Sequence, residues 1–428
     1  MSPGGIVGRQ PTAPVDAIRR QAHNRPSTPP RPPVHVPADS LLASLSAPAL
    51  EAPESGIVAV FNYGRLKEGL IPLWVGEGDL PTPAFISEAA TRALAAGETF
   101  YTYQRGIPPL REALAAYHAR LFGKPFSAER FFVTTGGMQA VQIAMRMIAE
   151  PGAEVLVPTP IWPNLAAAVG LAGGTPVSVP MDFSADGWRL DVARLAAAIV
   201  PGRTRGILIN SPANPTGWTA GLETLEAILD LSRRHGLWIV ADEVYGRFTY
   251  GDAPRAPSFH DIADPDDRIL YVNTLSKNWA MTGWRVGWLE APPILGQVIE
   301  NLVQYSTSGV PAFLQRGAVA ALEHGESFVA YQIERARRGR AALEGALAGL
   351  NRVRFAPPTG AFYLFLGIDG FDDTLALALR LVDEAGVGVA PGATFGTGGE
   401  PFVRLCFARD ETQVATAGAR LADWIRTL

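Results

Sequence analysis

From about residue 85 onward, apolar residues follow two alternating kinds of spacing. Helical spacing, three or four residues apart, predicts helices over residues 85–96, 108–121, 138–149, 221–235 and 327–349. Short apolar runs predict buried strands over residues 131–134, 155–158, 206–210, 237–241, 269–273 and 285–289. Strands that alternate with helices of this length indicate an α/β fold with a parallel sheet.

The two ends of the chain have different patterns. Short runs at residues 361–366, 387–390 and 402–407 predict a second domain of α+β type near the C-terminus. Residues 1–40 hold nine prolines, five arginines and only two acidic residues, without apolar periodicity. Such a segment buries too little surface to order itself. We expect residues 1–50 to form a disordered or loosely docked arm, or to reflect a start site set too far upstream.

Composition narrows the classes of function. A hydrophobic fraction of 47% is typical of a globular protein, and a net charge of −4 argues against nucleic-acid binding through bulk charge. No apolar run approaches the ~18–20 residues that span a bilayer, and no compact apolar segment resembles a secretory signal. The single cysteine, Cys406, excludes an intramolecular disulfide and a Cys-based zinc site. We therefore expect a cytoplasmic protein without membrane or nucleic-acid partners.

Lysine is rare, which restricts amine chemistry to three candidates. The 37 basic residues include only Lys67, Lys124 and Lys277, so the other 34 are arginines. Lys277 closely follows a predicted buried strand, in the run Thr-Leu-Ser-Lys. Burial there would lower the pKa of its amine, as a Schiff-base lysine requires. The alternative is an ordinary lysine at an exposed strand end.

Other strand ends carry candidate ligand groups. Asp242 follows the run over residues 237–241, and Tyr245 lies three residues further on. The carboxylate could face a ligand cation, or it could cap a helix or pair with a base. Gly137 and Met138 open a predicted helix whose free N–H groups could bind an anion, although an ordinary turn is the alternative. Arg285 could bind a phosphate or form a surface ion pair.

Three further features complete the candidate set. The turn cluster at residues 210–217 could present the amide of Asn214 into a cleft, or form only a tight connection. Trp162 could stack on a flat ring or lie in the core. Arg404 sits within a predicted strand, so it needs an anion, either a structural acid or a substrate carboxylate. Because ligands bind at the carboxyl ends of parallel strands, these groups should converge. Together they match pyridoxal 5′-phosphate chemistry best.

Five motifs in order carry a family resemblance. They lie at residues 210–217, 242–245, 276–288 (SKNWAMTGWRVGW), 359–365 (TGAFYLF) and 403–407. From about Ser55 to the C-terminus, the chain resembles the class I/II aminotransferases of fold type I, which use pyridoxal 5′-phosphate. The resemblance implies a large domain at residues 76–310 with a mainly parallel seven-stranded sheet. It also implies a smaller α+β domain made by residues 51–75 and 311–428.

The resemblance assigns the catalytic roles. Lys277 would hold the cofactor as a Schiff base and move the proton. Asp242 would keep the pyridine nitrogen protonated. Tyr245 and Asn214 would bond the 3′-oxygen of the ring, and Trp162 would stack on it.

The resemblance also assigns binding roles. The phosphate would be held by Gly137, Met138, Thr274, Ser276 and Arg285. The substrate carboxylate would be bound by Arg404, by the backbone of Gly76 and by Asn214, with Tyr363 nearby. Tyr101 matches a tyrosine that reaches the phosphate of the neighbouring subunit, which implies a homodimer with shared active sites.

One departure of this sequence from the family pattern bears on the choice of substrate. Acidic-substrate relatives often carry a lysine where this chain has Met138, and the run Ser55-Gly56-Ile57 lacks their small polar pattern. We therefore expect transfer from neutral or aromatic L-amino acids to a 2-oxo acid, with aspartate aminotransferase activity as the alternative substrate choice. A carbon–sulfur β-lyase on the same fold is the alternative reaction. A DNA-binding regulator would need an N-terminal domain that residues 1–40 cannot supply.

Overall fold

A computed structural model describes residues 41–50, 52–184 and 186–428. The chain divides into two units, Met1–Leu50 and Glu51–Leu428. Within the first unit, the described residues contain the short helix α3 (Ala47–Leu50). The part of the predicted arm at residues 1–40 lies outside the described residues. The second unit holds both larger sheets and all the predicted site residues.

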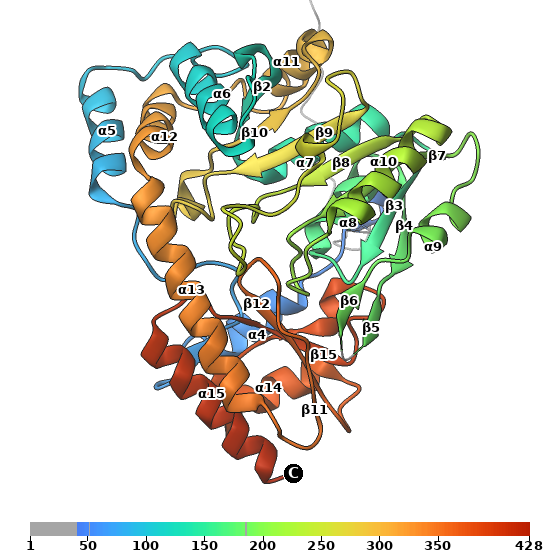
Figure 1. Ribbon diagram of the computed structural model, residues 1–428, viewed down its shortest axis with the longest axis vertical. Coiled ribbons are helices and arrows are strands. Elements are labelled where there is room, and N and C mark those ends of the chain that lie inside the picture. Colours follow the sequence, from blue (N-terminus) through green and yellow to red (C-terminus); the bar gives the residue numbers. More distant parts are fainter. Residues whose placement is uncertain (1–40, 51, 185) are drawn as a thin grey trace, which may run out of the picture. The chain divides into compact units, whose positions relative to one another are not determined.

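A seven-stranded sheet forms the centre of the second unit (Figure 1). Its order is β2–β10–β9–β8–β7–β3–β4, and every pair is parallel except those that β10 makes with β2 and β9. The predicted mainly parallel sheet is therefore confirmed. The strands are β2 (Phe131–Thr134), β3 (Glu154–Thr159), β4 (Thr175–Pro180), β7 (Thr204–Asn210), β8 (Trp238–Asp242), β9 (Ile269–Thr274) and β10 (Gly287–Glu290).

Both faces of this sheet are buried, which explains the continuous apolar runs of its strands. Ile207 of β7 joins the hydrophobic cluster that contains Ile228 of α10 (Leu222–His235). The next residue, Leu208, joins a different cluster that contains Ala144 of α7 (Gly136–Ile148). Successive side chains of a strand point to opposite faces, so each strand contributes to two cores. Helices α8 (Pro163–Leu171) and α11 (Gly296–Gln304) also pack in the cluster on the α7 face.

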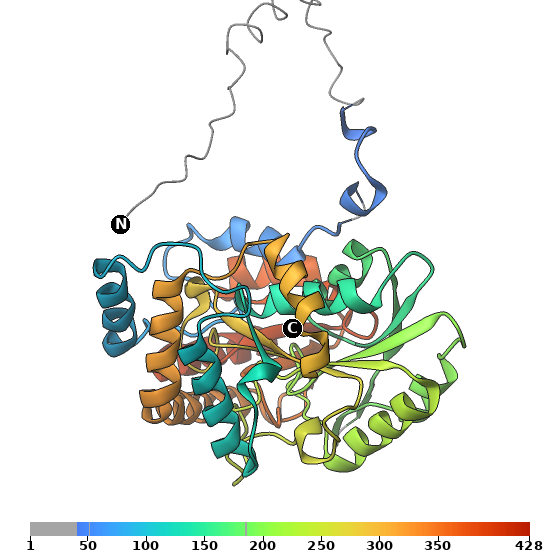
Figure 2. The same ribbon diagram turned by 90° about the horizontal axis from the view of Figure 1, so that it is seen from above.

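Three helices pack beside the β2–β10 edge of the sheet. They are α5 (Ala84–Ala95), α6 (Pro108–Phe122) and α12 (Ala312–His324), and they lie side by side (Figure 2). Leu114 of α6, Phe131 of β2 and Trp288 of β10 share their hydrophobic cluster. The predicted helices over 85–96 and 108–121 are thereby confirmed.

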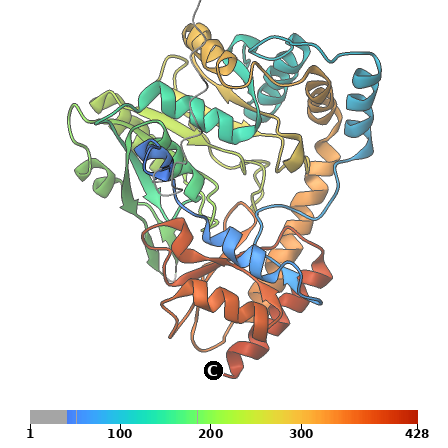
Figure 3. The ribbon, with the colours of Figure 1, turned by 180° about the vertical axis from the view of Figure 1, so that it is seen from behind.

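A four-stranded antiparallel sheet with order β11–β12–β15–β14 forms near the C-terminus. It shares one hydrophobic cluster with residues of the three C-terminal helices and of α4. Figure 3 shows α4 beside the C-terminal segment, where it contacts α14. The division into large and small domains stays a prediction. The elements are α4 (Gly56–Gly64), β1 (Ile71–Pro72), α13 (Glu326–Leu347), β11 (Val353–Arg354), β12 (Tyr363–Ile368), α14 (Thr374–Glu384), β13 (Val387–Gly388), β14 (Ala390–Pro391), β15 (Phe402–Cys406) and α15 (Glu411–Arg426).

The sequence pattern missed or misplaced some elements. Strand β4 was not predicted, because it lies at the sheet edge and exposes Thr175, Pro176 and Ser178. The strand predicted to begin at Arg285 begins at Gly287, because Arg285 adopts a left-handed conformation with φ 55°. Among the described residues, no helix is long and apolar enough to cross a membrane. The remaining elements are β5 (Asp182–Ser184), β6 (Gly187–Arg189), α9 (Val192–Ala197), η1 (Ala128–Arg130), η2 (Phe259–Asp261), η3 (Thr282–Trp284), η4 (Pro293–Leu295) and η5 (Gly392–Phe395).

Candidate active site

A cleft of about 460 Å³ opens at the carboxyl ends of the parallel strands. Strands β7, β8 and β9 end there at Asn210, Asp242 and Thr274. This is the place where ligands bind to open α/β sheets. Every predicted site residue except Tyr101 lines the cleft: Gly76, Gly137, Met138, Trp162, Asn214, Asp242, Tyr245, Thr274, Ser276, Lys277, Arg285, Tyr363 and Arg404.

Lys277 is the lysine of this cleft. Its Nζ donates a hydrogen bond of 2.7 Å to the carbonyl oxygen of Gly76. Although part of the side chain reaches the cleft, burial of the amine lowers the pKa of Lys277 to about 8. Of the other two lysines, Lys67 pairs with Asp383 and Lys124 donates to the carbonyl of His260. Only Lys277 therefore combines a lowered pKa with a place in the cleft.

Asp242 is a buried carboxylate without a basic partner among the described residues. Its Oδ1 accepts a 3.3 Å hydrogen bond from the backbone N–H of Val244, and no ion pair forms within 4.0 Å. Burial raises the pKa of Asp242 to about 7. A buried acid of this kind fits a ligand that brings its own positive charge. The lack of a basic side chain beside Asp242 thus indicates that this part of the cleft binds a positively charged group.

Asn210 supports this strand end and was named only as the start of a turn cluster. Its Nδ2 donates a hydrogen bond of 3.3 Å to the backbone carbonyl of Asp242. Its Oδ1 accepts a hydrogen bond of 2.8 Å from the backbone N–H of Asn214. The amide thus ties β8 to the turn that carries Asn214. The sequence signal was present, since Asn210 ends a predicted strand.

A group of hydrogen-bond donors surrounds the start of α7. The hydroxyl oxygens of Thr274 and Ser276 lie 2.9 Å apart, and Arg285 Nη1 lies 3.5 Å from Ser276 Oγ. Gly136 precedes Gly137 and has φ 75°, which favours glycine, and a Cβ there would displace the guanidinium of Arg285. Arg285 forms no ion pair among the described residues. These donors suit a phosphate.

Arg404 is a buried guanidinium that also lacks an acidic partner in the described part of the chain. It is 2% exposed, and its Nη1 donates a 3.0 Å hydrogen bond to Asn214 Oδ1. Its Nη2 donates to the carbonyl oxygen of Trp74, whereas its Nε has no partner. The ring of Tyr363 lies 4.6 Å from the guanidinium carbon. A buried, unpaired guanidinium fits a carboxylate ligand.

Two tyrosines, one from the turn after β8 and one from β12, meet beside Arg404. The hydroxyl oxygens of Tyr245 and Tyr363 lie 2.6 Å apart, and burial raises the pKa of both phenols. A Cβ on Gly76 would lie 2.5 Å from the Tyr363 hydroxyl, so this position requires glycine. The structure thus brings together Tyr245, Tyr363, Gly76 and Arg404, as predicted. The contact between the two hydroxyls was not predicted, since no sequence spacing links them.

The remaining wall of the cleft is mostly apolar. Trp162 precedes α8 and is half-buried, and Ile57 of α4 was predicted to make the pocket less polar. Val141 lies one helical turn after Met138 and was missed, although helical spacing signals it. Further lining residues that the sequence analysis did not single out are Val58, Val75, Glu77, Asn164, Val244, Val272 and Thr282.

Tyr101 does not line the cleft. It is 93% exposed and lines a separate cavity with Phe100 and Ser308. Its predicted contact with the phosphate of a neighbouring subunit stays a prediction.

The residues of the cleft fit pyridoxal 5′-phosphate. The Lys277 amine matches the cofactor's aldehyde, the lone Asp242 carboxylate matches its ring nitrogen, and the donors around Arg285 match its phosphate. Each of these groups lacks the partner that the cofactor would bring. Fold and cleft together define a pyridoxal-phosphate-dependent enzyme of fold type I.

Comparison with known proteins gives the family. A family model described as aminotransferase class I and II matches residues 68–421. The aspartate aminotransferase of Thermotoga maritima is 35% identical over 360 residues, which cover 84% of this chain and 92% of that protein. The solved structure of an aspartate aminotransferase from Thermotoga maritima matches with a TM-score of 0.83 and 33% identity, covering 89% of this chain and 100% of that one.

Two further relatives differ in the substrates that their names give. The arginine–pyruvate transaminase of Pseudomonas aeruginosa is 35% identical over 361 residues, covering 84% of this chain and 91% of that protein. The structure of an aromatic aminotransferase from Pyrococcus horikoshii has a TM-score of 0.79 and 33% identity, covering 86% and 99% of the two chains. The chain belongs to the class I and II aminotransferases. It is a pyridoxal-phosphate-dependent transaminase that acts on amino acids and 2-oxo acids.

Proposed function

We propose that this aminotransferase takes its amino group from neutral or aromatic L-amino acids in preference to acidic ones. The observation that carries the proposal is the set of cations that line the cleft in the described chain: Lys277, Arg285 and Arg404. Lys277 holds the cofactor, Arg285 binds its phosphate, and Arg404 binds the substrate α-carboxylate. No cation of this set is left for the second carboxylate of aspartate.

The proposed chemistry depends on two titrating groups. Pyridoxal 5′-phosphate supplies a ring that withdraws electrons from the substrate α-carbon. The Asp242 carboxylate holds a proton on the ring nitrogen, which strengthens that withdrawal. The Nζ of Lys277 acts as the base and then the acid of a 1,3-proton shift. It takes the proton from the substrate α-carbon and returns it two atoms away. Its pKa of about 8 leaves a useful fraction of neutral amine near neutral pH.

The other polar groups position the two ligands. We assign Asn214 and Tyr245 to the 3′-oxygen of the ring, and Trp162 to its face. The phosphate is held by the N–H groups of Gly137 and Met138 and by the side chains of Thr274, Ser276 and Arg285. Arg404 forms a bidentate pair with the α-carboxylate, beside the backbone of Gly76 and the hydroxyl of Tyr363.

The apolar wall then selects the donor. Ile57, Met138 and Val141 offer no charge to a distal carboxylate, and Glu77 adds an acidic side chain to the same cleft. An unpaired carboxylate that loses its hydration costs several kcal/mol. An alkyl or aromatic side chain has no such cost and gains from burial. No observation on the described residues favours the carbon–sulfur β-lyase alternative.

The test is a comparison of kcat/KM for aspartate with kcat/KM for alanine, leucine, methionine and phenylalanine, with 2-oxoglutarate or pyruvate as acceptor. We expect aspartate to be the poorest donor. The variant Met138→Lys should raise kcat/KM for aspartate at least about tenfold relative to leucine, whereas the control Met138→Leu should not. If aspartate were the best donor by tenfold or more in the unmodified enzyme, the argument from Met138 would fail.

We further propose that the enzyme is a homodimer whose active sites are shared. Phe100 and Tyr101 are 83% and 93% exposed, and Tyr305 is 87% exposed at the end of α11. Gln104 joins the loop of Tyr101 to the end of α11 through a 2.6 Å hydrogen bond with Gln304. These aromatic side chains thus belong to neighbouring segments. Exposed aromatic groups of this size favour a protein–protein contact.

A further inference from the structure

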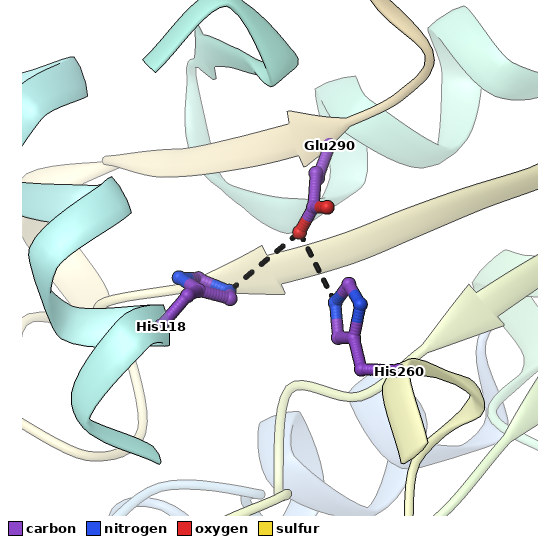
Figure 4. A group of neighbouring side chains, drawn as sticks. All are labelled: His118, His260 and Glu290. Atoms are coloured by element: carbon purple, nitrogen blue, oxygen red, sulfur yellow. Dashed lines mark ion pairs between the residues drawn. The ribbon is translucent and has the colours of Figure 1, made fainter. Parts of the chain in front are cut away.

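Three buried side chains with metal-binding groups meet away from the cleft, at Glu290 of β10. Figure 4 shows His118 of α6 and His260 of η2 pointing toward this carboxylate. The Nε2 atoms of His118 and His260 lie 3.8 Å and 3.1 Å from Glu290 Oε2. Glu290 pairs with Tyr271 in β9, three positions away from the pair that Gly287 forms with Thr274 at the cleft. The cluster is therefore separate from the cofactor site.

The hydrogen bonds around this cluster fix where the lone pairs point. His118 Nδ1 lies 2.9 Å from the backbone carbonyl of Leu114. A carbonyl only accepts hydrogen bonds, so Nδ1 carries the proton and Nε2 of the neutral ring carries a lone pair. Glu290 Oε1 accepts a 3.0 Å hydrogen bond from Arg130 Nε. Its Oε2 is buried and has no hydrogen-bond donor among the described residues.

His118 Nε2 and Glu290 Oε2 are thus both acceptors, and His260 Nε2, which lies 3.1 Å from Oε2, is not aligned for a regular hydrogen bond to it. Such an arrangement is unfavourable in a buried site unless a cation lies between the acceptors. Glu290 is fully buried, and each of the two histidines is at most 6% exposed. Aromatic side chains surround the histidines, including Phe122, Phe126 and Tyr271.

We propose that His118, His260 and Glu290 bind a divalent transition-metal ion, for which Zn²⁺ is the best match. Two histidine nitrogens and one carboxylate oxygen form a common zinc ligand set. Ligand atoms that lie about 2.0–2.2 Å from a tetrahedral ion are roughly 3.4 Å apart. The two distances to Glu290 Oε2, 3.1 Å and 3.8 Å, bracket that separation, and the three ligand atoms all lie within 4.8 Å of one another. Leu114 and Arg130 orient two of the ligands, as outer-shell groups do in metal sites.

A small cavity lies beside His118, one of the three ligands. Its volume is about 30 Å³, and Glu243 and Ser258 also line it. This volume holds one water molecule. The Ser258 hydroxyl donates to Glu243 at 2.8 Å, and Glu243 forms no ion pair among the described residues.

The ion would have a structural role. It would join α6, η2 and β10, which are far apart in the sequence. Because the folded chain alone assembles the three ligands, metal binding would stabilise the folded state. The cofactor site uses other residues, so cofactor content should not depend on the ion.

The experiment uses the full-length, cofactor-loaded enzyme. Metal is removed with dipicolinate, Zn²⁺ is added back, and bound zinc and the melting temperature are measured after dialysis. We expect about one Zn²⁺ per chain and a higher melting temperature. Co²⁺ should give a visible absorption spectrum typical of tetrahedral nitrogen and oxygen ligands.

The variants Glu290→Gln and His260→Gln should bind Zn²⁺ at least about 100-fold more weakly. Glu290→Gln should still fold, because the amide nitrogen that replaces Oε2 is itself a donor and can face the acceptor His118 Nε2. The matched control is His324→Gln, since the His324 side chain is 69% exposed and lies outside the cluster. This control should bind Zn²⁺ like the unmodified enzyme. Equal zinc retention by the unmodified enzyme and Glu290→Gln, or loss of zinc from both on dialysis, would overturn the proposal.

Discussion

Replacing Asp242 with asparagine should stabilise the cofactor-free protein at alkaline pH while it cripples the enzyme. The carboxylate is buried without a cation among the described residues, and burial raises the pKa of Asp242 from 3.8 to about 7. The folded state therefore binds this proton more tightly than the unfolded state. The stability that Asp242 contributes at low pH is lost as the pH rises from 3.8 through about 7.

The size of this loss follows from the pKa shift. One pKa unit corresponds to about 1.4 kcal/mol, so a shift of roughly three units costs about 4 kcal/mol once Asp242 is fully ionised. Between about pH 5 and about pH 8, the difference amounts to roughly 2.5 kcal/mol of unfolding free energy. Asparagine does not titrate, so Asp242→Asn lacks this loss. Burial also raises the pKa of the neighbouring Glu243 to about 7, and its charge repels that of Asp242, so Asp242→Asn removes this repulsion as well.

The assay is urea unfolding of both cofactor-free proteins at the two pH values. The free energy of unfolding of Asp242→Asn should gain about 2.5 kcal/mol on that of the unmodified protein between about pH 5 and about pH 8. With cofactor bound, the ring nitrogen pairs with Asp242 and the pH-dependent difference should shrink. The kcat of the loaded variant should fall at least about 100-fold.

A difference between the two proteins that stays constant within about 0.5 kcal/mol across this pH range would refute the reasoning. It would mean that the folded protein already provides a positive partner for Asp242. The inference that the cofactor brings that charge would then lose its basis.

Three further predictions concern single roles in the cleft. Borohydride reduction of the loaded enzyme followed by peptide mapping should place the cofactor label on Lys277, and a label on Lys67 or Lys124 would contradict the assignment. Arg404→Ala should lower kcat/KM by a factor that corresponds to about 2–5 kcal/mol of binding free energy, mainly through a higher KM, because a desolvated bidentate pair is lost. An unchanged KM in steady-state assays would exclude that role. Mixing Tyr101→Phe with Lys277→Ala subunits should restore one fully normal site per hybrid dimer, whereas light scattering that finds an active monomer would exclude shared sites.

The central sheet could be predicted because its strands are buried on both faces. Runs such as the one that ends before Asp242 are apolar at every position, so they stand out in the sequence. Asp242 and Lys277 follow the carboxyl ends of two such runs, and this position indicated where the cleft lies. Strand β4 could not be predicted in this way, because an edge strand with exposed polar residues has no continuous apolar run.

Contacts between distant segments could not be predicted from spacing. The hydrogen bond between Tyr245 and Tyr363 joins the turn after β8 to β12, and only the fold brings these elements together. The same holds for His118, His260 and Glu290, which share no motif and meet through three different elements. Arg285 was predicted to bind the phosphate, but its left-handed backbone depends on the turn that it completes.

The most direct test of the central claim follows the amino nitrogen itself. The enzyme is incubated with phenylalanine that carries an isotope label on its amino nitrogen, with 2-oxoglutarate or pyruvate as acceptor. Mass spectrometry should find the label in glutamate or alanine, in step with phenylpyruvate, and Lys277→Ala should transfer none. Equal transfer by Lys277→Ala, or release of the label as free ammonia without transfer to either acceptor, would contradict an aminotransferase that works through Lys277.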